Sequence, residues 1–103
     1  MVKSIVLYYM HMKAVWKGKV IAEAEDTVVV ENNHYFPASS VIMEYLKKSG
    51  DIYKCHWKGV ADYYDVIVDG ETNHNAGWVY SEPTEPAKNI KGRYAFWKGV
   101  EIK

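Results

Sequence analysis

The sequence predicts a mostly β protein with about eight short antiparallel strands, arranged as a two-sheet sandwich or a partly open barrel. One short helix is expected near residues 38–48. Three observations carry this prediction. Short segments rich in β-branched and aromatic residues are broken by turn signals about every 6 to 12 residues. The tripeptide Trp-Lys-Gly occurs three times, each time between segments that favour extended structure. Strands do not alternate with helical segments, which argues against a nucleotide-binding α/β fold.

The three Trp-Lys-Gly copies cover residues 16–18, 57–59 and 97–99. Glycine adopts the positive φ that a tight hairpin turn requires, and the tryptophan can pack across to the outgoing strand. We therefore expect three hairpins of one design. The alternative, three Lys-Gly turns that bind an anion, is less favoured because phosphate-binding loops need more glycine. The intervening segments differ from one another, so a solenoid is not expected.

The remaining strands follow from amino-acid composition and from the positions of turn signals. In chain order, the expected strands cover residues 13–16, 19–24, 27–31, 52–56, 60–68, 77–80, 93–97 and 100–102. The run TVVVE at residues 27–31 is β-branched and is expected to be the most buried strand. Residues 32–33 and 69–70 give turn signals. Residues 71–76 read as a polar loop.

The expected helix lies between Pro37 and Lys48. Ser39 or Ser40 can cap its start, and Gly50 follows its basic end. A helix this short depends on tertiary packing for its stability.

Composition excludes several classes of protein. A chain of 103 residues is the size of one domain, and its 13 basic and 13 acidic residues give a formal net charge of zero. We therefore expect neither a nucleic-acid partner nor a membrane partner. One cysteine cannot form an internal disulfide, and no signal peptide is evident, which together favour the cytoplasm. We expect no cofactor and no metal site, because the four histidines show no ligand spacing.

The aromatic content points to a binding groove. Nine tyrosines and four tryptophans are more than a core this small can bury, and such rings often line pockets. We expect a small-ligand site in which Lys58 holds an anionic group and aromatic rings stack on a planar one. The predicted set is His34, Tyr35, Cys55, Trp57, Lys58, Tyr63, Trp78 and Tyr80.

Two residues of this set could carry chemistry. Cys55 would need a nearby cation or histidine to become a reactive thiolate, and Lys58 lies across the turn. His34 is the residue type most used as a general acid or base. The alternatives are a buried core thiol and a histidine that caps its loop by hydrogen bonding.

Several runs resemble a known family. Residues 13–23, 27–37, 55–66 and 90–102 resemble the bacterial family catalogued as domain of unknown function 427. The resemblance implies a compact, tent-like fold of two sheets. It also implies a single domain over residues 12–103, with residues 1–11 as an N-terminal extension. It implies no biochemical function.

This chain departs from the family in one motif. His56 stands where members often have proline, so the backbone donor is retained there. A nucleotidyltransferase label is sometimes attached to the family. The chain lacks a Gly-Ser pair followed by Asp-x-Asp, and its nearest pair, Asp62 and Asp65, is expected on opposite faces of a strand.

Three hypotheses follow. The first is a domain that binds a small anionic or planar ligand in an aromatic groove without its own chemistry. The second is an enzyme that uses Cys55 or His34 in that groove. The third is a protein-interaction module, including a homodimer, whose surface is formed by exposed aromatic rings.

Overall fold

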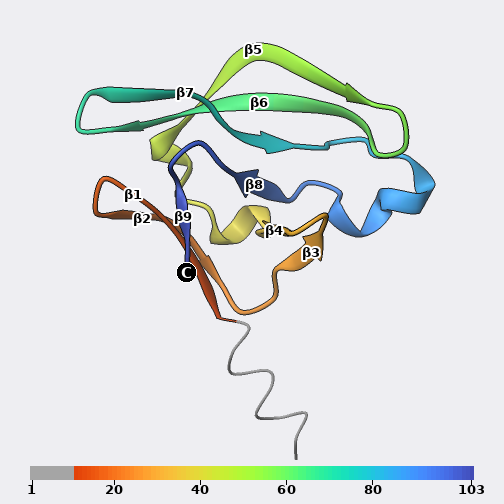
Figure 1. The fold of residues 1–103 in the computed structure, drawn as a ribbon, viewed down its shortest axis with the longest axis horizontal. Helices are drawn as coiled ribbons and strands as arrows, with labels where there is room; N and C mark the ends of the chain where they lie inside the picture. The colour runs from red at the N-terminus through yellow and green to blue at the C-terminus, as the bar shows by residue number, and fades with distance from the viewer. Residues whose placement is uncertain (1–10) are drawn as a thin grey trace, which may run out of the picture.

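The computed structural model describes residues 11–103, which form nine strands in three sheets (Figure 1). The mostly β fold predicted from the sequence is confirmed. Residues 1–10 of the predicted N-terminal extension lie outside the described residues. The strands are β1 (Met12–Trp16), β2 (Lys19–Ala24), β3 (Val28–Val30), β4 (Asn33–Tyr35), β5 (Leu46–Cys55), β6 (Gly59–Val68), β7 (Glu71–Val79), β8 (Tyr94–Phe96) and β9 (Glu101–Ile102). Three 3-10 helices complete the fold: η1 (Ala38–Ser40), η2 (Met43–Tyr45) and η3 (Glu85–Ile90).

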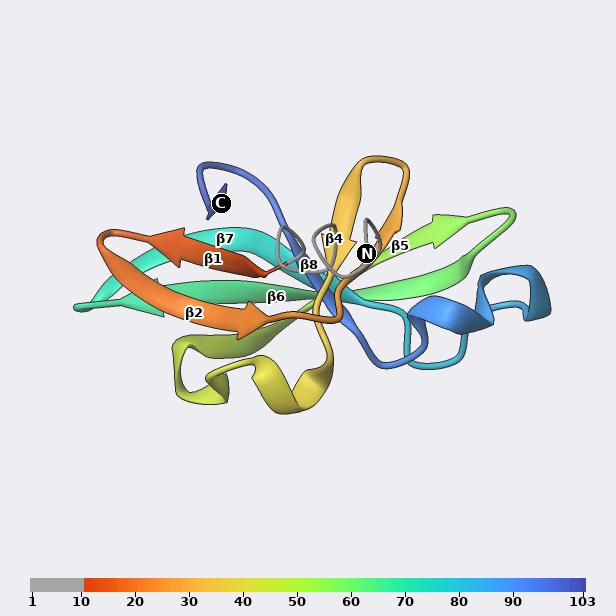
Figure 2. The same cartoon turned by 90° about the horizontal axis from the view of Figure 1, so that it is seen from below.

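The sheets lie in two layers. Strands β5, β6 and β7 form the upper layer in Figure 1, and β8 continues their sheet toward the lower layer. The lower layer holds the sheet β2-β1-β9 and the separate hairpin β3-β4. Figure 2 shows the β5–β6 turn and η3 at one end of the molecule, and the β6–β7 and β1–β2 turns at the other. At that second end, Lys17 and Glu71 form an ion pair at 2.9 Å that links the two layers.

Two apolar clusters hold the layers together. The first lies between the two larger sheets and consists of Ala14, Ile21, Ala22, Ala24, Phe36, Val41, Val66, Val68, Ala76, Phe96 and Val100. The second lies beside the β3–β4 hairpin and consists of Tyr35, Ala61, Trp78, Tyr80, Ala87, Ile90 and Ala95. The second cluster is richer in aromatic rings, and the candidate site described below adjoins it.

The first two Trp-Lys-Gly copies form hairpins, as predicted. In the first, Lys17 and Gly18 have φ values of 52° and 75°, the signs that a two-residue type I′ turn requires. In the second, Cys55 pairs with Gly59, so the loop has three residues and only Gly59 has a positive φ, of 111°. The two hairpins therefore share a sequence motif but not a turn geometry.

The prediction of a third hairpin is wrong. Strand β8 pairs with β7, whereas β9 pairs with β1, so residues 97–99 carry the chain from one sheet to another. Lys98 and Gly99 still form a tight turn with φ values of 55° and 92°, closed by a bond from the Val100 amide to the Trp97 carbonyl at 3.2 Å. The local residues predict the tight turn, but the turn does not determine which strand the outgoing segment pairs with.

The predicted helix is only partly present. Helical backbone occurs as the two single turns η1 and η2, and neither buries a residue. Residues 46–48 instead begin β5, where Leu46 pairs with Val66 and Lys48 with Tyr64. Residues 46–48 pair with β6 instead of extending a helix, and Tyr45 and Leu46 pack against the first apolar cluster in this arrangement. Within residues 11–103, no helix has the length and apolarity needed to span a bilayer.

Two strand predictions also need correction. Strand β3 is not the most buried, since it pairs only with β4 and Val29 is 48% exposed. Residues 71–76 are not a loop but the first part of β7, in which Thr72 pairs with Ile67. Their polar side chains are compatible with a strand because an antiparallel sheet can expose one face to water.

Candidate functional site: an aromatic cavity between two sheets

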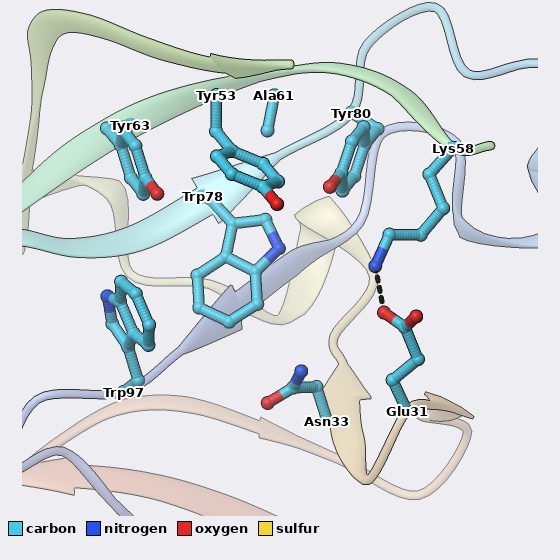
Figure 3. A pocket seen from close by; sticks show the side chains of 9 residues that line it. All are labelled: Glu31, Asn33, Tyr53, Lys58, Ala61, Tyr63, Trp78, Tyr80 and Trp97. Atoms are coloured by element: carbon cyan, nitrogen blue, oxygen red, sulfur yellow. Dashed lines mark hydrogen bonds and ion pairs between the residues drawn. The ribbon is translucent and has the colours of Figure 1, made fainter. Parts of the chain in front are cut away.

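A cavity of about 290 Å³ lies between the four-stranded sheet and the β3–β4 hairpin (Figure 3). Its lining residues are Glu31, Asn33, Tyr53, Lys58, Ala61, Tyr63, Trp78, Tyr80 and Trp97. Five of these nine residues are aromatic. Figure 3 shows the tyrosine side chains on one side of the cavity, Glu31 and Asn33 on the other, and Trp78 between them.

Strand alternation places most of these side chains on one face. Ala61 and Tyr63 are two residues apart on β6 and therefore point the same way. Tyr53 of β5 pairs with Ala61, and Trp78 of β7 pairs with Tyr63. Tyr80 continues the alternation two residues after Trp78. The aromatic face thus follows directly from the register of three neighbouring strands.

Hydrogen bonds fix both tryptophan rings. The Trp78 indole Nε1 donates to the Tyr35 hydroxyl at 3.2 Å, and the Trp97 Nε1 donates to the Asn75 carbonyl at 2.7 Å. The two indoles pack edge to face with centroids 5.4 Å apart. Since their N–H groups are already engaged, both rings offer the cavity only apolar surface.

A polar network holds the carbonyl that orients Trp97. Asn75 has a φ of 55°, and its amide donates to the Asp65 carboxylate at 2.9 Å. Its side chain donates to Asp51 at 2.9 Å, and His74 contacts Asp65 at 2.9 Å. The register of β5 and of β6 shifts beside these carboxylates, so the network stabilises an irregular part of the sheet.

Three tyrosine hydroxyls are directed toward the space around Trp78 (Figure 3). Tyr80 is only 2% exposed, and its hydroxyl has no hydrogen-bond partner among residues 11–103. Burial raises the pKa of Tyr80 and of Tyr63 above the ordinary tyrosine value. Both hydroxyls therefore keep their protons at neutral pH and can donate to a bound molecule.

The ammonium of Lys58 lies at one end of the cavity and donates to the Glu31 carboxylate. Lys58 is 6% exposed, and its Nζ lies 5.5 Å from the Trp57 ring centroid and 5.6 Å from that of Tyr80. The second carboxylate oxygen of Glu31 accepts from the Trp57 indole at 3.2 Å. Lysines of the other two Trp-Lys-Gly copies are exposed, so only the middle copy turns its cation inward.

The ion pair is charged on both sides at neutral pH. Burial alone lowers the pKa of Lys58, but the hydrogen bond to Glu31 and the electrostatic effect of neighbouring groups outweigh burial and raise it above the usual lysine value. The hydrogen bonds from Lys58 and then Trp57 lower the pKa of Glu31. The two lining charges therefore cancel.

Contacts of the turn itself direct Lys58 inward. The Thr84 amide donates to the Lys58 carbonyl at 3.0 Å, and the Thr84 hydroxyl donates to the Trp57 carbonyl. A Cβ atom at Gly59 would lie 3.4 Å from the Cα of Pro83. The segment before η3 thus packs closely on this turn and holds its backbone in place.

The structure brings half of the predicted site residues into one cavity. Those that line it are Lys58, Tyr63, Trp78 and Tyr80. Tyr35 and Trp57 do not line it, but each bonds to a residue that does: Tyr35 to Trp78, and Trp57 to Glu31.

The two candidate catalytic residues do not line the cavity. Cys55 is partly buried against the second apolar cluster, two residues beyond Tyr53 on β5. The His34 Nδ1 lies 2.8 Å from the Thr27 hydroxyl. His34 falls between Asn33 and Tyr35 on β4, so alternation directs it away from the cavity.

Five lining residues were missed: Glu31, Asn33, Tyr53, Ala61 and Trp97. Two carried a usable signal, since Tyr53 shares the strand face of Cys55 and Trp97 belongs to a repeated motif. The sequence predicts Glu31 at the end of a strand over residues 27–31, followed by a turn at residues 32–33. The turn in fact occupies Glu31 and Asn32, with φ values of 53° and 66°, which places Glu31 at the hairpin tip.

The acidic pair of β6 lies elsewhere. Asp62 is 3.9 Å from Lys48, whereas Asp65 belongs to the network around Asn75. Neither lines the cavity. In residues 11–103, no group of three or more histidine, cysteine or acidic side chains is arranged to hold a metal ion.

Comparison with known proteins identifies the family. The model of a family described as domain of unknown function (DUF427), with the short name NTP_transf_9, matches residues 5–102. The matched range starts ahead of Met12, the start expected from the resemblance. No curated protein matches the chain. Since the family model covers nearly all of the sequence, the chain belongs to the family of domain of unknown function 427.

Proposed function

We propose that the protein binds a small planar ligand in the aromatic cavity and performs no chemistry on it. The observation that carries this proposal is the Tyr80 hydroxyl, which is directed into the cavity and has no hydrogen-bond partner among the described residues. A ligand with an acceptor oxygen would receive a hydrogen bond from this hydroxyl.

The dimensions of the cavity support a compact ligand. A volume of about 290 Å³ is near the lower limit of ligand pockets, which start at roughly 300 Å³. One ring, or two fused rings, fits this space better than a phosphorylated or extended molecule. The fixed faces of Trp78 and Trp97 favour a flat ligand, because aromatic rings pack best against planar surfaces.

Catalysis receives less support than binding. Cys55 and His34 would have to act in the same space, yet neither lines the cavity, and the His34 ring already has the Thr27 hydroxyl beside it. Lys58 could lower a neighbouring pKa, but its charge is paired with Glu31.

An interaction surface is the second candidate function. Tyr53, Trp57 and Trp97 are exposed although they are large and apolar, and Tyr53 and Trp97 line the cavity. Exposed aromatic groups of this kind are enriched where proteins meet. Sedimentation analysis tests the homodimer: a monomer at high protein concentration argues against it.

A matched pair of probes tests planar-ligand binding. Benzamide and cyclohexanecarboxamide carry the same amide on a flat and a puckered ring. We expect benzamide to bind more tightly and to shift the amide NMR signals of Ala61 and Trp78. Equal binding of both probes, or signal changes confined to other parts of the fold, would contradict the proposal.

The repeated motif offers a matched control variant. Trp97 lines the cavity, whereas Trp16 occupies the same place in the first Trp-Lys-Gly copy and does not. We expect Trp97→Leu to weaken benzamide binding and Trp16→Leu to leave it unchanged. Loss of binding in both variants would indicate a general loss of structure and not a local site.

A further inference from the structure

We propose that the Glu31–Lys58 pair makes the cavity selective for uncharged planar ligands whose ring edge carries carbonyl oxygens. This inference rests on the proposed function and names the chemical class of its ligand. It assigns Glu31 as a specificity-determining residue, because without Glu31 the buried Lys58 would attract anions.

The first argument for this selectivity is the charge balance of the residues that line the cavity. Glu31 and Lys58 are the two charged residues among those that line the cavity, and they bond to each other. Both oxygens of Glu31 are engaged, one by Lys58 and one by the Trp57 indole. An anion would therefore meet a cation that is already neutralised, with a carboxylate beside it. A cation would meet Lys58 itself.

Desolvation makes this balance selective. A charge that enters a partly dry cavity loses hydration and must recover that energy from an opposite charge. Lys58 is 6% exposed, and the surrounding walls are aromatic. Neither sign of charge finds a free counter-ion in the lining, so an uncharged ligand loses the least on entry.

The second argument is the set of hydrogen-bond donors and acceptors that line the cavity. The Tyr80 hydroxyl is protonated and has no acceptor among residues 11–103. The hydroxyls of Tyr53 and Tyr63 face the same space (Figure 3), and an ammonium has three N–H donors, of which Glu31 takes one. Glu31, the charged acceptor in the lining, already accepts hydrogen bonds from Lys58 and Trp57. The cavity therefore offers mainly donors, and the Asn33 side chain adds one amide donor and one amide acceptor, so a ligand with carbonyl acceptors is favoured.

Ring carbonyl oxygens meet both requirements. They accept hydrogen bonds in the plane of the ring, so the ring faces remain free to pack on Trp78 and its neighbours. They carry no formal charge. Lactams, imides and quinones belong to this class, and benzamide, which carries one uncharged carbonyl attached to the edge of a planar ring, is a simple probe for it.

Three probes that each carry one benzene ring test the class on the full chain. Benzamide is uncharged, benzoate is an anion and benzyltrimethylammonium is a cation. With the unchanged protein, we expect benzamide to bind at least about tenfold more tightly than either ion, as measured by NMR titration. If an ion binds as tightly as benzamide, the selectivity inference is overturned while ligand binding stands. If none of the three binds, the proposed function itself fails.

Glu31→Gln tests the role of the pair. This variant leaves Lys58 without a counter-charge, and we expect benzoate affinity to rise about tenfold or more while benzamide affinity changes little. Glu44→Gln, an exposed change outside the cavity lining, is the matched control and should leave all three affinities unchanged. No rise in benzoate affinity in Glu31→Gln overturns the inference.

A second variant covers the case in which Glu31→Gln fails to fold. Lys58→Met removes the cation and leaves Glu31 charged, so the selectivity should reverse toward benzyltrimethylammonium. Unchanged preference for benzamide over the cation in that variant contradicts a role for the ion pair.

Discussion

Lys58 and Glu31, 27 residues apart in the chain, join the β5–β6 turn to the tip of the β3–β4 hairpin at one end of an aromatic cavity. The partners differ in exposure: the side chain of Lys58 is 8% exposed and that of Glu31 is 51% exposed. Water can therefore replace Lys58 around Glu31, but it cannot easily replace Glu31 around Lys58. The first prediction follows from this asymmetry.

Removing the acid should cost more stability than removing the base. We expect Glu31→Gln to lower the free energy of unfolding by about 1–3 kcal/mol, because a buried ammonium loses its charged acceptor. Lys58→Met should cost less, because methionine keeps the apolar contacts and Glu31 becomes hydrated. Urea unfolding measures both, with the exposed Lys54→Met as control. Equal losses for the two variants would argue that burial of Lys58 is unimportant.

Phenylalanine variants of Tyr35 and Tyr80 should distinguish a hydroxyl that stabilises the fold from one that binds the ligand. Tyr35 accepts from the Trp78 indole, so Tyr35→Phe leaves a buried N–H unpaired and should cost about 1–3 kcal/mol. Tyr80→Phe removes a hydroxyl that has no partner among the described residues, so stability should stay equal or rise. The same variant should weaken benzamide binding. A clear loss of stability in Tyr80→Phe would show that its hydroxyl is satisfied within the protein.

Alanine variants of Gly59 and Gly50 test the cost of backbone strain at two positions with a positive φ. Gly59 and Gly50 have φ values of 111° and 96°, so alanine is strained at both positions. Only at Gly59 would the new Cβ approach other backbone, at 3.4 Å from Pro83 and 3.5 Å from Thr84. Because these are ordinary van der Waals distances, we expect Gly59→Ala and Gly50→Ala to lower the melting temperature by similar amounts through backbone strain. Gly59→Ala should also weaken benzamide binding, since its turn positions Lys58.

The hydrogen bonds around Asp65 should affect both the stability of the fold and the position of Trp97 in the cavity wall. Asp65→Ala removes the acceptor of the Asn75 amide and should cost about 1–3 kcal/mol. Because the Asn75 carbonyl orients Trp97, the tryptophan fluorescence of the folded variant should also change. The exposed Glu44→Ala serves as control. Destabilisation without any spectral change would mean that Trp97 is held independently of the network.

Alkaline titration should show late tyrosine ionisation and falling stability. Burial, followed by the contact with Tyr64, raises the pKa of Tyr94 from 10.0 to about 12. Between these values the unfolded chain loses a proton that the folded chain keeps, so the free energy of unfolding decreases as pH rises. The near-ultraviolet absorbance of tyrosinate should show a late step that Tyr94→Phe removes. Ionisation of all tyrosines together, below the unfolding transition, would contradict this expectation.

Residue patterns alone determined the class of fold and several local features. The mostly β architecture, the bounds of β2 and the turns at residues 17–18, 69–70 and 98–99 depend on side chains and glycines within a few positions. Strand alternation likewise places Ala61 and Tyr63 on one face, whichever strand pairs with them. Features of this kind are predictable because neighbouring residues determine them.

Only the tertiary structure decided which segments meet. Leu46–Lys48 joined a sheet instead of a helix, and the turn at residues 97–99 led to a different sheet, because strands compete for partners that lie far away in the chain. The same holds for the site. Lys58 turns inward because Thr84 binds its turn, and Glu31 reaches it because the β3–β4 hairpin packs beside that turn. Burial and long-range hydrogen bonds set these contacts, and neither is encoded within a few consecutive residues.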